Sequence, residues 1–218
     1  MLNTIVYKTI IEEIKAGGCS LVVVTKNQSL EDILKIYELG HKDFGENRPQ
    51  ELIKKYNALP KDINWHLIGH LQSNKVKNVV PIVKMIHSVD SFSLAYEINK
   101  QCAKSNKDLS LLIQIKLSDE ETKHGFIFQD LVSSLKSDDW QLLTNIRICG
   151  VMGIGSLTND VNISRQEFKK LKLYYDTLKK QFLPNATFSE ISMGMSFDYK
   201  VAMEEGSTIV RIGSLLFQ

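Results

Sequence analysis

Lys26 is the residue whose type and position most favour covalent chemistry in this sequence. It directly follows residues 20–25 (SLVVVT), an apolar and β-branched segment that predicts a strand. A lysine at the end of such a strand is expected to lie in a poorly solvated site, where desolvation lowers the pKa of the amine and makes it nucleophilic. Such an amine forms Schiff bases with carbonyl compounds. Position alone leaves a second interpretation open, a lysine in a surface loop.

Two segments towards the end of the chain favour the binding of an anion. Residues 192–196 (SMGMS) and residues 209–214 (IVRIGS) each combine a glycine with a serine. Gly194 and Gly213 let backbone N–H groups approach an anion, while Ser196 and Ser214 add hydroxyl donors. Together the segments predict a phosphate site, and the alternative is two ordinary turns.

Three further polar residues are candidates for a ligand site. Arg211 lies inside a β-branched strand, where it needs a strong partner, either a carboxylate of the protein or an electron-rich ring nitrogen of a ligand. Asn47 could donate to a ring hydroxyl, or it could cap a helix that opens at Pro49. Glu46 could equally pair with a basic residue at a neighbouring strand end or meet the ligand.

Histidines and cysteines give no sign of a metal or disulfide framework. His41, His87 and His124 lack the spacing of metal ligands, so we predict no metal site. His66 alternates with apolar neighbours and fits a hydrogen-bonded core histidine. The three cysteines form no CxxC pair, and we expect each of them to be a small core residue: Cys19, Cys102 and Cys149.

Strand and helix patterns alternate along the whole chain. Eight strands are predicted from apolar segments, at residues 20–25, 42–44, 65–68, 84–87, 109–115, 146–152, 190–192 and 208–212. Seven helices are predicted between them, at residues 30–39, from 49 onwards, 73–80, 91–103, 128–135, 164–182 and 199–205. An additional helix, with apolar residues from Leu2 to Ile14, precedes the first strand and ends at Gly17-Gly18.

This alternation predicts an α/β fold, a single (β/α)8 TIM-type barrel with an N-terminal helix, formed by residues 1–218 as one domain. The N-terminal helix is expected to cover the place where a helix would follow the last strand. Because sites in such barrels lie at the carboxyl ends of the strands, the candidate residues above should share one end of the barrel.

Composition agrees with an ordinary globular protein. Hydrophobic residues make up 43% and charged residues 24%, and the formal net charge of +2 is too small to favour nucleic acid or an anionic membrane as partner. The sequence has no apolar run of membrane-spanning length and no signal-peptide pattern, so we expect a cytoplasmic protein.

Taken together, several segments resemble the pyridoxal phosphate homeostasis protein family, single-domain relatives of the alanine racemase N-terminal barrel. The resemblance runs from about residue 21 to residue 217 and rests on VVVTKN, FGENRPQEL, WHLIGHLQSNK, IHSVDS, KHGF, GVMGIG and ISMGMSFDYKVAMEEGSTIVRIGSLLF. Departures from the family pattern are Thr25 in place of a serine, Asn27 in place of a threonine, and His70 in place of a proline.

The resemblance implies pyridoxal 5′-phosphate (PLP) as the cofactor. It implies that Lys26 forms the Schiff base and that Arg211 faces the pyridine nitrogen. The remaining family positions are Asn47 near the ring and, for the phosphate, Ser196, Gly213 and Ser214. Lys123 resembles a family lysine outside the Schiff-base site.

The resemblance also implies a carrier of PLP in intracellular PLP homeostasis, with little or no turnover. Arg211 opposite the ring nitrogen would activate the cofactor only weakly, and no second domain that could supply another base is expected. Alternatives are a PLP-dependent amino-acid racemase and a cofactor-free Schiff-base aldolase or sugar-phosphate isomerase. A pure interaction module would need an exposed apolar face or a charge run, and the sequence shows neither. Expected partners are PLP and apo PLP-dependent enzymes as recipients, and we expect a monomer or a weak dimer.

Overall fold

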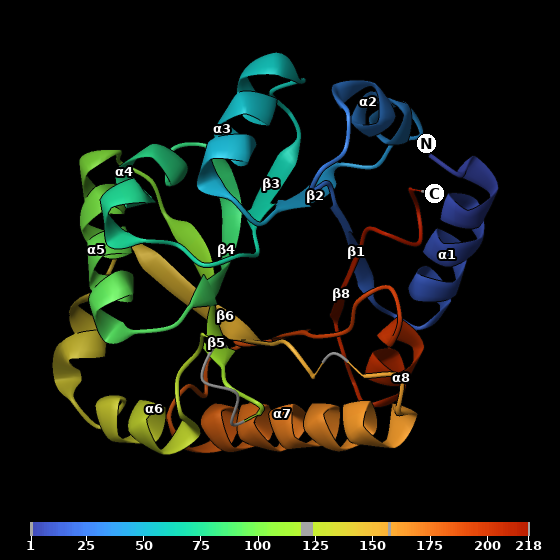
Figure 1. Ribbon diagram of the computed structural model, residues 1–218. Coiled ribbons are helices and arrows are strands. Elements are labelled where there is room, and N and C mark those ends of the chain that lie inside the picture. Colours follow the sequence, from blue (N-terminus) through green and yellow to red (C-terminus); the bar gives the residue numbers. More distant parts are fainter. Residues whose placement is uncertain (1, 119–123, 157, 218) are drawn as a thin grey trace.

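Eight parallel strands form a closed barrel in the computed structural model, which describes residues 2–118, 124–156 and 158–217 (Figure 1). In chain order the strands are β1 (Ser20–Val24), β2 (Asp43–Glu46), β3 (Asn64–Leu67), β4 (Val83–Val89), β5 (Leu109–Ile115), β6 (Ile146–Gly153), β7 (Glu190–Ser192) and β8 (Ile209–Ile212). Each strand pairs with the next one, and β8 closes the barrel by pairing with β1, with Ser20 opposite Ile209. The predicted (β/α)8 barrel is therefore confirmed.

Helices surround the barrel (Figure 1). They are α1 (Thr4–Ala16), α2 (Leu30–Glu38), α3 (Pro49–Ala58), α4 (Val76–Val79), α5 (Phe92–Lys104), α6 (Phe128–Ser134), α7 (Val161–Gln181) and α8 (Tyr199–Glu204). The N-terminal helix α1 lies in this ring between α2 and α8. The Leu2 N–H donates to Asp32 of α2 at 3.3 Å, and the Tyr199 hydroxyl of α8 donates to Glu13 at 2.7 Å.

Burial explains why the strands lack an alternating pattern. Leu21, Val22 and Val23 are all buried, because β1 packs against helices on one face and against the barrel interior on the other. The helices, in contrast, are buried along one face only. In α7 this face is formed by Ser164, Phe168, Leu171, Tyr175 and Leu178.

Several predicted boundaries were wrong by one to three residues. Strand β1 ends at Val24, and β2 runs on to Glu46. The predicted helix at residues 73–80 begins as a 3₁₀ helix, η1 (Ser73–Lys75), before α4. A second 3₁₀ helix, η2 (Asp138–Leu142), was not predicted from the sequence. Cys19 and Cys102 are buried, as predicted, but Cys149 is only partly buried. Lys123 lies outside the described residues.

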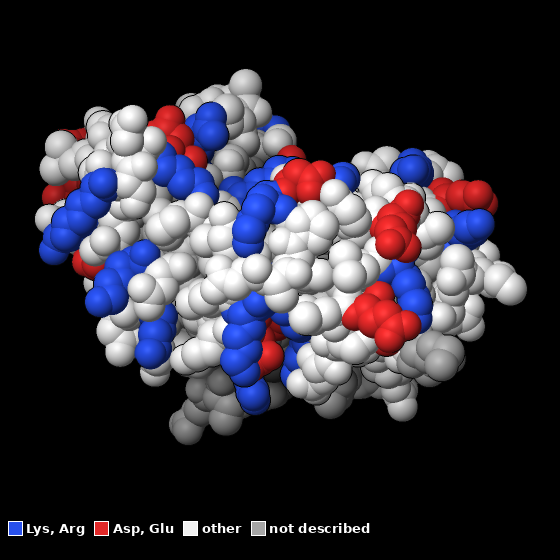
Figure 2. Space-filling view, turned by 90° about the horizontal axis from the view of Figure 1, so that it is seen from above, with Lys and Arg blue, Asp and Glu red and all other residues white. Residues whose placement is uncertain are grey.

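Charges are mixed on the face shown in Figure 2, where basic and acidic side chains are interspersed with uncharged surface. No single-sign patch covers this face, which agrees with the small formal net charge of +2. Among the described helices, none combines the length and the apolar character that crossing a bilayer requires.

Candidate cofactor-binding site

One pocket of about 300 Å³ at the carboxyl ends of the strands brings the predicted cofactor-binding residues together. Its lining includes all six of them: Lys26, Asn47, Ser196, Arg211, Gly213 and Ser214. The volume lies at the lower end of the range for small-molecule sites. A larger cavity of about 460 Å³, lined by Tyr7 and Asp43 among others, lies at the opposite end of β1 and β2 and contains none of the six.

Lys26 reaches this pocket from the turn after β1, but its surroundings differ from the expected ones. The side chain is exposed, so the prediction of a poorly solvated lysine was wrong. The reason is the position of the turn, because β1 already ends at Val24 and Thr25 takes the buried position at the strand end. Asn27, which follows, has a positive φ of 63° and turns the chain back towards α2.

Asn47 has a buried acceptor without a partner. Its Oδ1 is buried and makes no hydrogen bond, although the residue lines the pocket. The alternative role as a helix cap was wrong, because the cap position of α3 is Arg48 and no side chain caps this helix. A buried unsatisfied oxygen costs free energy, so its position beside a pocket indicates a ligand that donates a hydrogen bond.

A buried ion pair holds the backbone beside Lys26 and Asn47. Glu46 and Lys55 are both buried and hydrogen-bonded to each other. The Lys55 amine also donates to the carbonyl oxygen of Thr25 at 2.6 Å, and the Thr25 hydroxyl donates to Glu46 at 2.8 Å. The other Glu46 oxygen accepts the N–H of Asn47 at 3.2 Å. Glu46 therefore pairs with a base, as one of its two expected roles required, but this base comes from helix α3 and not from a neighbouring strand end.

The turns after β7 and β8 meet at Ser196. Its Oγ accepts the N–H of Gly213 at 3.3 Å and the N–H of Leu215 at 3.4 Å. These long hydrogen bonds mark two backbone donors that point at one place, as in an anion-binding turn. Glycine is required at Gly194, where φ is +90° and a Cβ would lie 2.5 Å from the Cβ of Ala202.

Arg211 is buried and lines the pocket without a carboxylate partner. Its Nη1 donates to Ser192 Oγ at 2.6 Å, and its Nη2 donates to the carbonyl oxygen of Gly153 at 3.0 Å. Burial lowers the pKa of Arg211 to about 10, and the charge of Asp198 opposes this shift. The guanidinium is therefore still protonated at neutral pH, and it is held by neutral groups alone among the described hydrogen bonds.

A chain of hydrogen bonds leads from Arg211 down the inside of the barrel. Ser192 Oγ lies 3.0 Å from His87 Nδ1, His87 Nε2 lies 2.9 Å from His66 Nδ1, and His66 Nε2 lies 3.1 Å from Asp43 Oδ1. Because arginine only donates, the Ser192 hydroxyl can donate to His87. Each neutral imidazole then donates one hydrogen bond to the next group, and the chain ends at the carboxylate of Asp43, which accepts. This assigns the hydrogen to Nε2 in both histidines.

Electrostatics support these neutral histidines. Burial lowers the pKa of both rings, of His87 well below its ordinary value, and the charge of Arg211 acts in the same direction on His87. At the far end, hydrogen bonds from His66 and Lys84 hold the pKa of Asp43 far below its ordinary value, although burial opposes this. The chain thus runs between a fixed cation and a fixed anion.

Sequence reasoning missed His87, Ser192 and Lys55 as supporting residues. His87 and Ser192 lie in strands beside apolar residues, and this pattern only indicates burial. Lys55 lies on a helix whose other lysine, Lys54, is exposed, so its burial had no distinct signal.

We expect the free energy of unfolding to fall as the pH is lowered from about 7 to about 5. Unfolded histidines bind protons near pH 6.5, whereas burial lowers the pKa of His41, His66 and His87 in the folded chain. The unfolded state therefore binds more protons, and each histidine contributes up to about 1.4 kcal/mol per pH unit below 6.5. Urea unfolding at several pH values measures the slope. His87→Asn should reduce the slope by the equivalent of about one bound proton. An unchanged slope would contradict the lowered pKa of His87 in the folded chain.

The comparisons with known proteins agree with the barrel fold. The family model described as the N-terminal domain of alanine racemase matches residues 7–218, which defines the class of barrel. A pyridoxal phosphate homeostasis protein of Aquifex aeolicus is 41% identical over 199 residues, covering 90% of this chain and 85% of that protein. Another, from a Synechocystis species, is 38% identical over 219 residues, covering 100% of this chain and 98% of the relative. The chain belongs to the pyridoxal phosphate homeostasis protein family.

Solved structures give the same result. PipY of Synechococcus elongatus, determined without PLP, has a TM-score of 0.90 and 33% identity, covering 98% of both chains. The same protein with PLP bound has a TM-score of 0.84 and 34% identity, covering 92% of this chain and 93% of PipY.

Proposed function

We propose that this chain binds PLP in the pocket lined by Lys26, Asn47 and Arg211 and serves as an intracellular carrier of the cofactor. One observation carries this proposal: an amine, an unpartnered buried acceptor, a guanidinium without a carboxylate partner and a serine that accepts two backbone N–H groups border one pocket. An aldehyde, a ring hydroxyl, a ring nitrogen and a phosphate are the groups of PLP that these partners fit. The PLP bound to PipY supports the proposal.

Each partner would have a separate task. The Lys26 amine would condense with the aldehyde, forming a C=N bond with loss of water. The N–H groups of Gly213 and Leu215, which Ser196 Oγ now accepts, would bind phosphate oxygens together with the hydroxyls of Ser196 and Ser214. Asn47 Oδ1 would accept the hydrogen of the ring hydroxyl. Bound in this way, the cofactor supplies an electron-withdrawing ring and a masked aldehyde.

We also propose that turnover by this protein is low. Arg211 would face the ring nitrogen as a donor, and this leaves the nitrogen unprotonated, which weakens the ring as an electron sink. Racemisation in addition needs a base on each face of the substrate carbon. Among the described lining residues of the pocket, Lys26 and Arg211 are the only ones with titratable side chains. Storage and transfer of PLP to apo enzymes fit such a site better than racemisation.

Reduction with borohydride tests the binding mode. Protein incubated with PLP and then reduced should carry one pyridoxyl group per chain, and peptide mass spectrometry should locate it on Lys26. A modification spread over many exposed lysines, or located on another single lysine, would contradict the proposal.

A second measurement tests turnover. Protein loaded with PLP should leave the α-hydrogen of L-alanine unexchanged in D₂O over hours, as followed by NMR, while a PLP-dependent racemase run in parallel exchanges it. Exchange at a rate comparable with the racemase would support the amino-acid racemase alternative instead.

A further inference from the structure

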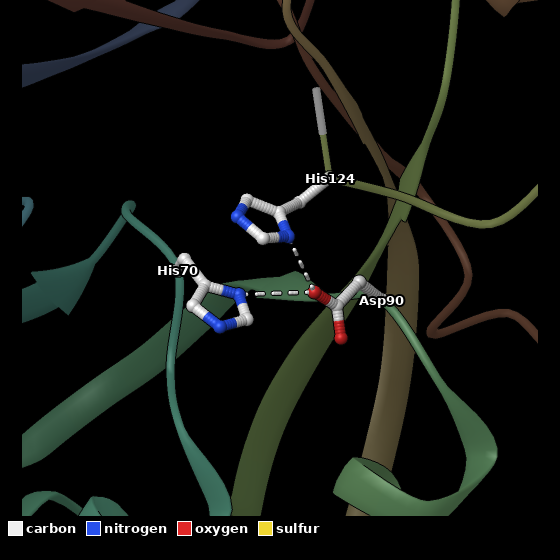
Figure 3. Close-up of side chains that lie close together, drawn as sticks. All are labelled: His70, Asp90 and His124. Atoms are coloured by element: carbon white, nitrogen blue, oxygen red, sulfur yellow. Dashed lines mark hydrogen bonds and ion pairs between the residues drawn. The ribbon is translucent and has the colours of Figure 1, made fainter. Parts of the chain in front are cut away.

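Three potential metal ligands meet at the carboxyl end of the barrel, beside the pocket described above. His70 follows β3, Asp90 directly follows β4, and His124 lies after β5. Because β3, β4 and β5 are neighbouring parallel strands, their ends lie along one stretch of the rim. Figure 3 shows both imidazole rings directing a nitrogen at the same oxygen of Asp90. The spacing of these residues in the sequence gave no hint of the cluster, and we had predicted no metal site.

The distances suit a metal ion. Asp90 Oδ2 lies 3.1 Å from His70 Nδ1 and 3.8 Å from His124 Nδ1, and all three potential ligand atoms lie within 4.8 Å of one another. A tetrahedral zinc ion with bonds of about 2.0–2.1 Å separates neighbouring ligand atoms by about 3.3 Å. The two separations from the Asp90 oxygen lie on either side of this value, and side-chain rotation would adjust them.

The second histidine is difficult to explain by hydrogen bonding alone. One imidazole within hydrogen-bond distance, that of His70, is sufficient to pair with the carboxylate. His124 Nδ1 lies 3.8 Å from the same oxygen, beyond a hydrogen bond, while its ring is stacked on His70 with 3.8 Å between centroids. A shared metal ion would give both rings a common partner. Binding requires His124 to rotate out of the stack, and its side chain is the more exposed of the two, at 54% against 40%.

Hydrogen bonds to neighbouring strands hold the backbone of both histidines. Ser88 of β4 donates from its hydroxyl to the carbonyl oxygen of Gly69, next to His70, at 2.6 Å. Gln114 of β5 donates to the carbonyl oxygen of His124 at 2.8 Å. Such bonds limit the positions that the backbone of each histidine can adopt.

We propose that His70, Asp90 and His124 bind a divalent late transition-metal ion of the zinc type. Two imidazole nitrogens and one carboxylate oxygen favour such ions over Mg²⁺ and Ca²⁺, which prefer oxygen ligands. Three protein ligands leave at least one position for water or a small anionic ligand. The two histidines line a pocket of about 170 Å³ that shares Ile68 and Ile154 with the predicted PLP pocket, so the ion would lie at the border of the cofactor site.

Calorimetric titration with ZnCl₂ tests the proposal. The full-length protein is freed of metal with EDTA, dialysed and titrated without PLP, so that the result does not depend on the proposed function. One zinc ion per chain is expected to bind. Asp90→Asn and His124→Ala should each weaken this binding at least 10-fold, because either change leaves only two of the three ligands.

Controls separate the site from other zinc-binding groups. Cys149→Ser removes the partly exposed thiol, the other described group with high zinc affinity at the surface, and should leave binding unchanged. Circular dichroism should show all variants folded, since the His124 side chain is exposed and Asp90→Asn and Cys149→Ser keep the size of the side chain. Absence of zinc binding by the unaltered protein would overturn the proposal. So would zinc binding by Asp90→Asn and His124→Ala that is as tight as that of the unaltered protein.

Discussion

Replacing Lys26 with alanine is expected to abolish the yellow colour that the protein acquires with PLP. The amine that condenses with the aldehyde is lost, while the remaining pocket residues stay in place. Because the Lys26 side chain is exposed, truncation should change the free energy of unfolding by no more than about 0.5 kcal/mol. Visible spectra of both proteins, recorded after incubation with PLP and gel filtration, measure the effect.

Lys116→Ala is the matched control for this experiment. Lys116 lines the neighbouring pocket at the same end of the barrel, so its amine is also available to an aldehyde there. The variant should become as yellow as the unaltered protein. If Lys26→Ala kept its colour while Lys116→Ala lost it, the amine would have been assigned to the wrong strand end.

Replacing Lys55 with methionine is expected to lower the free energy of unfolding by about 3 kcal/mol. Glu46 would remain buried and charged without its cation, and removal of one partner from a buried pair typically costs about 3–5 kcal/mol. The hydrogen bonds that remain, from the Thr25 hydroxyl and the Asn47 N–H, favour the lower end of this range. Urea unfolding at neutral pH measures the change.

A neighbouring lysine on the same helix provides the control. Lys54 pairs with Glu51 at 3.3 Å, but its side chain is 75% exposed, so Lys54→Met should cost less than about 1 kcal/mol. The double variant Glu46→Gln with Lys55→Met removes both charges and should be more stable than the sum of the single changes predicts. Additive effects would show that the two side chains do not depend on each other.

We expect loss of the Glu46–Lys55 pair to weaken PLP binding as well. The Lys55 amine holds the carbonyl oxygen of Thr25, next to Lys26, and Glu46 holds the N–H of Asn47. Loss of the pair loosens both segments at the pocket edge.

The fold could be predicted closely from the sequence because its pattern is local. A strand buried on both faces needs a continuous apolar segment, as in residues 109–115, and each helix needs one apolar stripe. What could not be predicted in this way were the boundaries, such as the early end of β1 at Val24, and the 3₁₀ helix at Asp138–Leu142. The end of a helix or strand depends on which hydrogen bonds its last one or two residues form, and this is not visible in the sequence pattern.

The lining of the pocket was also accessible from the sequence. Residues that directly follow parallel strands share one end of a barrel, so Lys26, Asn47 and Ser214 could be grouped without knowledge of their contacts. Their surroundings were less accessible. The exposure of Lys26 depends on where the first turn begins, and the unpartnered oxygen of Asn47 depends on the course of the chain into α3.

The amino-acid sequence by itself determined the order of strands and helices and the end of the barrel where the polar residues gather, because both depend on neighbours along the chain. Only the tertiary structure decided which distant side chains meet. The Glu46–Lys55 pair, the chain from Arg211 to Asp43 and the cluster of His70, Asp90 and His124 all join different strands or helices. Closure and register of the barrel set these distances, and no spacing in the sequence encodes them.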